Sequence, residues 1–280
     1  MRWPGRFLPL CALFSALFAA LPFAHALPLE TAVPGGLALV RLGNGAARPQ
    51  AWFREKRVAV VRDGQGWVAL VGLPLSLEPG VHPLRVASAG GSEETRPIRV
   101  ASKRYPLQRF TVPDHRKVEP LPEDLLRIER EQKRIDEIKA LFRETPDVDL
   151  AFRQPAAGRL TGSFGLRRII NGLERMPHAG IDFAVPVGTP VNAAGAGVVV
   201  ETGDYFFNGN SVYIDHGQGL VTLYCHLDRI EVLAGEPVAA GQRIGLSGNT
   251  GRTSGPHLHW TVLLNGAAVD PRLFLPRTKR

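Results

Sequence analysis

The chain has 280 residues, of which 44% are hydrophobic, and it carries a formal net charge of +8. This length and apolar content allow one large or two ordinary globular domains with a real core. The positive charge indicates an anionic partner, but no recognisable nucleic-acid-binding motif accompanies it, so we expect no nucleic acid partner.

The first residues have the pattern of a targeting segment. Two arginines precede a long apolar run that ends in Ala24-His25-Ala26, the small-x-small sequence that signal peptidase reads. We therefore predict a signal peptide over residues 1–26 and a mature chain that begins at Leu27. The alternative is an uncleaved membrane anchor, since the run approaches spanning length. The cleavage pattern favours removal, so we expect an exported protein of the periplasm or cell envelope without a stable membrane span.

Short β-like runs broken by turns fill residues 27–105. The runs cover residues 37–40, 57–61, 66–71 and 82–86. Asp63-Gly64 lies between two of them and is a strong hairpin signal. This spacing predicts a small β-sandwich or barrel, without a titratable cluster, as an N-terminal accessory domain.

A linker with a charged helix is predicted over residues 106–150. Its first part is rich in proline, and Pro122-Glu123-Asp124 then opens a helix that runs to about Arg143. Acidic residues in the first turn complement the helix dipole. The helix could serve as a strut between domains or bind a partner, but an ordinary helix packed on one face is the better interpretation.

Residues 151–276 are rich in glycine and in predicted strands, and a short basic tail follows at residues 277–280. Two stretches, residues 186–201 and 235–245, share a turn, a Pro-Val strand and a glycine-flanked strand. This weak internal repeat resembles barrel-sandwich-hybrid folds. The fold class we predict is therefore mainly β: a small β domain, a linker helix, and a glycine-rich, barrel-sandwich-hybrid-like catalytic domain.

Three short motifs in this last region place histidines and an aspartate at strand spacing. They are His178-Ala179-Gly180-Ile181-Asp182, Tyr224-Cys225-His226-Leu227 and Gly255-Pro256-His257-Leu258-His259-Trp260. Residues i and i+2 of a strand point to the same face, so His257 and His259 can look into one cleft. Gly180 lets the chain bend so that His178 and Asp182 surround a common centre. Two imidazoles and one carboxylate match a zinc site with an open fourth position.

Cys225 is the single cysteine left once the predicted signal peptide is removed, so no internal disulfide is expected. Strand alternation between Tyr224 and His226 should turn it away from the cleft. A thiol nucleophile is conceivable beside histidines, but a buried small apolar side chain is the better interpretation.

With these motifs the chain resembles the LytM/lysostaphin-type zinc endopeptidases, which cut peptide bonds in bacterial peptidoglycan. The resemblance covers about residues 153–275, including Ser163-Phe164-Gly165-Leu166-Arg167 and Gly248-Asn249-Thr250-Gly251. It implies that His178, Asp182 and His259 bind one zinc ion per chain. It also implies that His226 and His257 are the catalytic histidines beside the metal, with no division of roles between them.

The expected function is therefore zinc-dependent hydrolysis of peptidoglycan cross-links, with the cross-links and a regulatory protein as the expected partners. One alternative is a non-catalytic relative that binds peptidoglycan or activates another hydrolase. Another is a sugar-phosphotransferase carrier, which would use two histidines without zinc. The N-terminal domain could lie across the zinc groove or act as a passive targeting module, and the sequence leaves both open.

Overall fold

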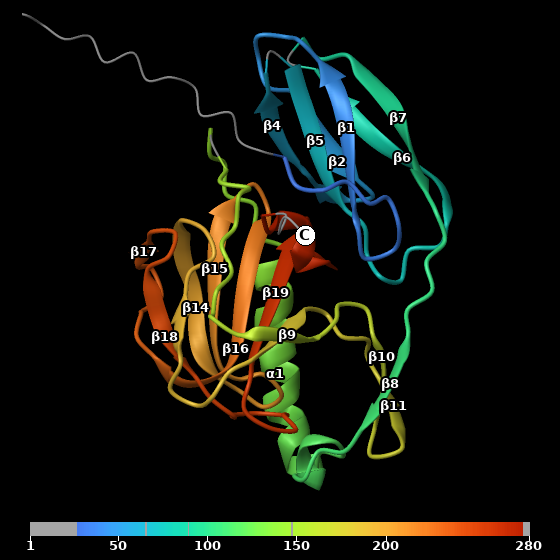
Figure 1. Ribbon diagram of the computed structural model, residues 1–280. Helices are drawn as coiled ribbons and strands as arrows, with labels where there is room; N and C mark the ends of the chain where they lie inside the picture. The colour runs from blue at the N-terminus through green and yellow to red at the C-terminus, as the bar shows by residue number, and fades with distance from the viewer. Residues whose placement is uncertain (1–26, 65, 89, 147, 277–280) are drawn as a thin grey trace, which may run out of the picture.

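The computed structural model describes residues 27–64, 66–88, 90–146 and 148–276. The predicted signal peptide and basic tail lie outside these residues. The described chain is mainly β with one α-helix, so the predicted fold class is confirmed (Figure 1). No helix in these ranges is both long enough and apolar enough to cross a membrane.

The N-terminal region consists of two antiparallel sheets. The first has the order β1-β5-β4 and the second the order β3-β2-β6-β7. Side chains that include Ala51, Leu84 and Ile98 form an apolar core shared by the two sheets. The predicted hairpin at Asp63-Gly64 joins β4 and β5. The strands are β1 (Leu37–Gly43), β2 (Gln50–Phe53), β3 (Lys56–Arg57), β4 (Ala59–Asp63), β5 (Gly66–Gly72), β6 (Gly80–Ala87) and β7 (Glu93–Val100).

The C-terminal region is built on a ten-stranded sheet whose main path runs β17-β14-β15-β16-β19-β12-β9. Strand β15 is buried along almost its whole length and β16 is buried from Leu220 to Leu227. Trp260 and Tyr224 lie in the main core. The strands are β9 (Arg159–Gly162), β12 (Ile181–Ala184), β13 (Pro190–Asn192), β14 (Gly197–Tyr205), β15 (Gly209–Gly217), β16 (Leu220–Ile230), β17 (Pro237–Val238), β18 (Arg243–Ser247), β19 (Leu258–Leu264) and β20 (Ala267–Val269). A 3₁₀-helix, η2 (Pro271–Phe274), follows them.

A small separate sheet links the two regions. Strand β8 (Leu107–Phe110) runs parallel to β10 (Arg167–Ile170), which forms a hairpin with β11 (Leu173–Arg175). The proline-rich stretch therefore contributes a strand to this small sheet rather than serving only as a spacer. A 3₁₀-helix, η1 (His115–Lys117), then leads into the α-helix.

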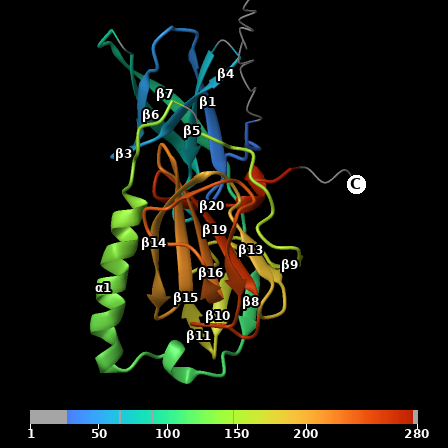
Figure 2. The ribbon, with the colours of Figure 1, turned by 90° about the vertical axis from the view of Figure 1, so that its left-hand side faces the viewer.

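Helix α1 (Pro122–Lys139) lies along one face of the ten-stranded sheet (Figure 2). The Asp124 carboxylate accepts a hydrogen bond from the Leu121 amide, which caps the start of the helix. Ile138 is buried against sheet residues such as Tyr213 and Cys225, while Leu126 is 70% exposed. The predicted helix is confirmed as one packed on a single face, but it ends four residues before Arg143.

Candidate metal centre

The five predicted site residues come from three neighbouring strands and the segments that lead into them. Asp182 on β12 pairs with His259 on β19, and His259 pairs on its other side with Cys225 on β16. Side chains that are directly opposite in an antiparallel pair point to the same face. The sheet register therefore brings the motifs together, although His178 and His259 are 81 residues apart in the sequence.

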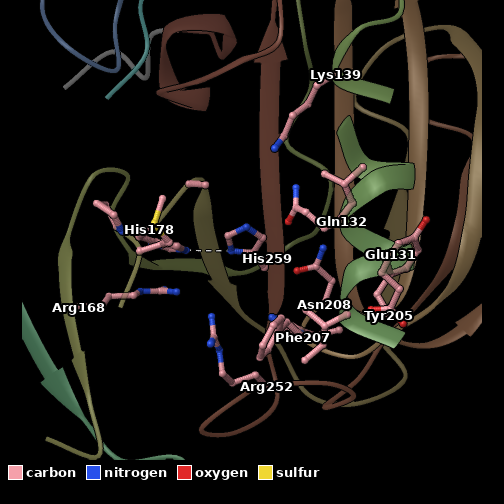
Figure 3. A pocket seen from close by; sticks show the side chains of 16 residues that line it. Glu131, Gln132, Lys139, Arg168, His178, Tyr205, Phe207, Asn208, Arg252 and His259 are labelled. Carbon is pink, nitrogen blue, oxygen red and sulfur yellow. Dashed lines mark hydrogen bonds between the residues drawn. The ribbon is translucent and has the colours of Figure 1, made fainter. Parts of the chain in front are cut away.

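His178, Asp182 and His259 form a tight cluster of possible metal ligands. His178 Nε2 lies 2.9 Å from His259 Nδ1, a contact drawn as a dashed line in Figure 3, and 3.0 Å from Asp182 Oδ1. His259 Nδ1 lies 2.9 Å from the same carboxylate oxygen. These separations are slightly shorter than the spacing of about 3.3 Å that ligands at about 2.0–2.1 Å from a tetrahedral ion would have.

The donor chemistry of this cluster fits a cation. His178 Nδ1 donates a hydrogen bond to the Ser163 carbonyl at 2.9 Å, so Nε2 of the neutral ring presents a lone pair. His259 has its Nε2 2.9 Å from Thr261 Oγ1, which orients that ring. Two nitrogens and one carboxylate oxygen thus converge on one point, and there are too few hydrogen-bond donors among them to pair all three acceptor atoms. A zinc ion suits this donor set.

Asp182 is largely buried yet remains ionised. Burial acts to raise the pKa of this carboxyl, but the adjacent His178 and His259 rings hold the pKa well below its usual range. A carboxylate that is charged and directed at two imidazoles is the form that a metal requires.

His226 and His257 lie beside this cluster and make matching hydrogen bonds to the backbone. His226 Nδ1 donates to the Thr250 carbonyl, and His257 Nδ1 donates to the Gly255 carbonyl, each at 2.8 Å. Their ring centroids are 4.8 Å apart, and His257 Nε2 is 3.8 Å from Asp182 Oδ1. With Nδ1 as the donor, the lone pair of each ring lies on Nε2, and His257 Nε2 is on the side of the ligand cluster. Burial, followed by repulsion from His257 and His259, lowers the pKa of His226 well below its ordinary value.

Our expectation that strand alternation turns Cys225 away from the cleft was wrong. Cys225 lies opposite His259 and therefore on the same sheet face. The register between β15 and β16 shifts between Tyr224 and Leu227, and His226 has a positive φ of 62°. This bulge turns His226 to the site instead of the opposite face. Cys225 is 1% exposed, and burial raises its thiol pKa, which agrees with a small buried side chain and not with a nucleophile.

A cavity of about 330 Å³ opens in front of the cluster of candidate metal ligands. Helix α1 forms one wall with Glu131 and Gln132, and the opposite wall follows β10 and the segment before His178. Its lining residues are Ile128, Glu131, Gln132, Ile135, Lys139, Arg168, Met176, Pro177, His178, Ala179, Tyr205, Phe207, Asn208, His226, Arg252 and His259. The aromatic segment after Asp204 contributes three of them, Tyr205, Phe207 and Asn208.

Sequence reasoning missed the contribution of α1 and of two arginines to this cavity. Arg168 and Arg252 each directly follow a stretch that carries the family resemblance, Ser163–Arg167 and Gly248–Gly251. Position next to such a stretch was the available signal. The helix residues had none, because nothing in their sequence shows where the helix packs.

Two family models match the chain. "Peptidase family M23" matches residues 176–271, and "Peptidase family M23 N-terminal domain" matches residues 30–103. The curated relatives include the peptidoglycan DD-endopeptidases ShyA and ShyC of Vibrio cholerae, which are 49% identical over 113 residues and 47% identical over 116 residues. These alignments cover 40% and 41% of this chain but only 26% and 27% of the relatives.

A solved structure from Pseudomonas aeruginosa, assigned to peptidase M23, is similar over most of the molecule. It shares 42% sequence identity with a TM-score of 0.76, and the match covers 88% of this chain and 96% of that one. Identity at this level over almost an entire solved chain is decisive for family membership. The chain belongs to peptidase family M23.

Proposed function

We propose that this chain is a zinc-dependent endopeptidase that hydrolyses peptide cross-links of bacterial peptidoglycan. The observation that carries the proposal is the cluster of His178, Asp182 and His259 with two further histidines beside it. The curated relatives from Vibrio cholerae, named peptidoglycan DD-endopeptidases, support the substrate class. One zinc ion per chain is part of the proposal.

The residues of the site would divide the work of amide hydrolysis. A zinc ion held by His178, Asp182 and His259 supplies Lewis-acid polarisation and makes water more acidic. The Nε2 lone pair of His226 or His257 can accept the proton of the attacking water. The other ring, once protonated, can stabilise the developing oxyanion or protonate the leaving amine. The two rings have equivalent hydrogen bonds to carbonyls, so either order of roles is compatible with their orientation.

The same proposal includes how the chain is organised and where it acts. Residues 27–105 would form an accessory domain, residues 106–150 a linker with α1, and residues 151–276 the catalytic domain. A substrate in the cell wall requires export to the periplasm or cell envelope, in agreement with the signal peptide expected from the sequence. A regulatory protein remains a proposed partner.

The two alternatives are less well supported by the site. A non-catalytic relative would be expected to lack ligands, whereas all five positions are filled and gathered in one place. A phosphate carrier would not need a carboxylate within 3.0 Å of two imidazoles, as Asp182 is here. That negative charge would repel a phosphoryl group on either ring.

The proposal is tested with His226→Ala and His257→Ala in digests of purified sacculi. Each variant should keep its zinc, since neither ring belongs to the ligand cluster, and should release soluble fragments about 10²–10⁴ times more slowly. Metal analysis and fragment release are measured on the same samples. Wild-type release rates in either variant would refute the role of that histidine. A wild-type chain that binds zinc and releases nothing would favour the non-catalytic alternative.

A further inference from the structure

Two arginines project into the cavity beside the cluster of candidate metal ligands. Arg168 lies on β10, and Arg252 lies in the loop between β18 and β19. Figure 3 shows their guanidinium groups directed into the space next to His178 and His259. Neither residue has a role in the proposed hydrolysis, so their position there needs another explanation.

Both guanidinium groups lack adequate partners for their charge. Arg168 Nη2 is 3.7 Å from Asp182 Oδ2, and its buried Nε has no hydrogen-bond partner. Among the described residues Arg252 has no ion pair, only a contact with the Phe207 ring. Glu131, the one acidic residue in the described lining, is already used by the Arg127 side chain and the Phe206 amide.

Aromatic rings hold the two side chains in position. The Arg168 guanidinium lies 5.6 Å from the centroid of Phe110, and that of Arg252 lies 4.5 Å from the centroid of Phe207. The Arg252 amide also donates to the Phe207 carbonyl at 2.8 Å. A guanidinium stacked on a ring keeps its N–H edge available, so these donors are oriented before a ligand arrives.

The accumulated positive charge calls for an anion. Arg252 is repelled by Arg168 and Arg175, and the Asp182 carboxylate near Arg168 would be shared with the metal. Burial, with this repulsion, lowers the pKa of Arg252 to about 10, which still leaves it charged at neutral pH. Like charges in a partly buried cleft are unfavourable unless a counter-charge binds between them.

We propose that Arg168 and Arg252 form a subsite for a free carboxylate of the peptide substrate, close to the bond that is cut. This inference rests on the proposed function, since it names a feature of the substrate for the same cavity. A carboxylate matches the planar fork of a guanidinium and can accept two parallel hydrogen bonds. The subsite would select peptides whose carboxylate, main-chain or side-chain, lies next to the scissile bond.

The test uses the zinc-loaded full chain with His226→Ala, which prevents turnover, and measures peptide affinity by calorimetry. Two pairs of peptides are compared, and each pair consists of a carboxylate peptide and its carboxamide counterpart. In the first pair the C-terminal carboxylate is replaced, and in the second pair the side-chain carboxylate next to the scissile bond is replaced. We expect one carboxylate peptide to bind about 10–100 times more tightly than its amide twin, from one or two charged hydrogen bonds. The pair that responds identifies the source of the carboxylate.

Substitutions then assign the preference to the arginines. Arg252→Gln, introduced into the His226→Ala chain, should abolish the preference for the carboxylate peptide. Arg252→Lys should retain part of this preference, since a lysine keeps the charge but not the planar fork of the guanidinium. Arg167→Gln is the matched control, because Arg167 is on the same strand but does not line the cavity, and it should keep the full preference. Arg168→Gln should resemble Arg252→Gln, with zinc content measured because Arg168 contacts Asp182.

Equal affinity for both members of both pairs, or an unchanged preference in Arg252→Gln, would overturn the subsite. Sacculus digestion by the wild-type chain separates this result from a failure of the proposed function. A chain that digests sacculi without discriminating the peptides lacks the subsite but keeps the function. A chain that discriminates the peptides without digesting sacculi keeps the subsite and loses the function.

Discussion

At the scale of single residues, close approaches at two glycines determine the geometry of the candidate metal ligands. A Cβ on Gly180 would lie 2.3 Å from the Trp260 carbonyl oxygen and 2.8 Å from His259 Cε1. A Cβ on Gly162 would lie 2.0 Å from Asp182 Oδ2. The absence of a side chain at both positions lets β9, β12 and β19 approach closely enough for the ligand atoms to meet.

Gly180→Ala is therefore expected to weaken the site and the fold together. The added methyl group must push β12 from β19, at a cost of about 1–3 kcal/mol in the free energy of unfolding. We also expect weaker zinc binding, because His178 and Asp182 flank the displaced backbone. Denaturant unfolding and zinc affinity measure both effects. Gly255→Ala is the matched control, since a Cβ there meets nothing within 4 Å. Equal behaviour of the two variants would contradict this explanation.

The sequence predicted which side chains meet at the site but not how two of them reach it. Strand spacing selected His178, Asp182, His257 and His259, and the resemblance to the endopeptidase family added His226. Gly180 was expected to allow a bend, and the chain does bend there, although its φ is not positive. What the sequence did not show is the close approach of Gly180 to β19. The turn of His226 to the cleft depends on a bulge. A bulge arises from pairing with a partner strand, so local alternation could not reveal it.

At the scale of elements, the hairpin of β15 and β16 contains a buried polar network behind the site. His216 Nδ1 donates to the Ala196 carbonyl, and His216 Nε2 pairs with Thr222 Oγ1, both at 2.8 Å. The Tyr224 hydroxyl lies 3.1 Å from Thr222 Oγ1 and accepts a hydrogen bond from the Ala194 amide. Each polar atom has a partner, so the network stabilises one arrangement of these strands while His216 stays neutral.

Acid should destabilise the fold through His216. Burial lowers its pKa from 6.5 to about 4, against weaker opposing effects of Ala196, Asp215 and Asp149. Below about pH 6.5 the unfolded chain binds a proton that the folded chain excludes, so the free energy of unfolding falls. The loss is about 1.4 kcal/mol per pH unit down to about pH 4, where it levels off. Denaturant unfolding measured between pH 7 and 4.5 should show that the free energy of unfolding depends less steeply on pH in His216→Gln than in the wild type. Equal slopes would contradict a neutral buried His216.

Helix α1 shows what element prediction can and cannot provide. Its start was predicted from Pro122 and the acidic residues after it, and the preference for a helix packed on one face is confirmed. Its place as a wall of the cavity was not predicted, since Glu131 and Gln132 acquire that position only through contacts with distant strands. The pairing of β8 with β10, 60 residues apart at Leu107 and Arg167, is equally non-local.

At the scale of the whole molecule, the N-terminal region is firmly docked at a distance from the metal cluster. The buried Asn265 side chain accepts from the Gly72 amide at 2.7 Å and donates to the Gly72 carbonyl at 3.1 Å. Gln218 makes a similar contact with the Val60 amide. Asn265 directly follows the C-terminal end of β19, whereas His257 directly precedes its start. No residue of 27–105 is among the described lining of the cavity. In this arrangement α1, and not the N-terminal region, borders the groove.

Asn265→Gly should loosen this docking without changing the site. Asn265 has a positive φ of 44°, so glycine removes the hydrogen bonds without backbone strain. Leaving the Gly72 amide and carbonyl without partners should lower the free energy of unfolding by about 1–3 kcal/mol. Arg54→Gly, at an exposed residue with φ 52°, controls for the effect of glycine itself. Sacculus digestion well below the melting temperature should be unchanged. Faster digestion by Asn265→Gly would instead indicate that the docked N-terminal region restrains the enzyme.

In the proposed mechanism His178, Asp182 and His259 hold the zinc ion on which cross-link hydrolysis depends. The most direct test measures zinc content and fragment release from purified sacculi for the wild-type chain and for Asp182→Ala. Asp228→Ala is the control, because Asp228 is an exposed carboxylate on β16 close to His226 in the sequence. We predict one zinc per chain and rapid release for the wild type and the control, and loss of both in Asp182→Ala. Full zinc occupancy and undiminished release in Asp182→Ala would contradict this zinc site.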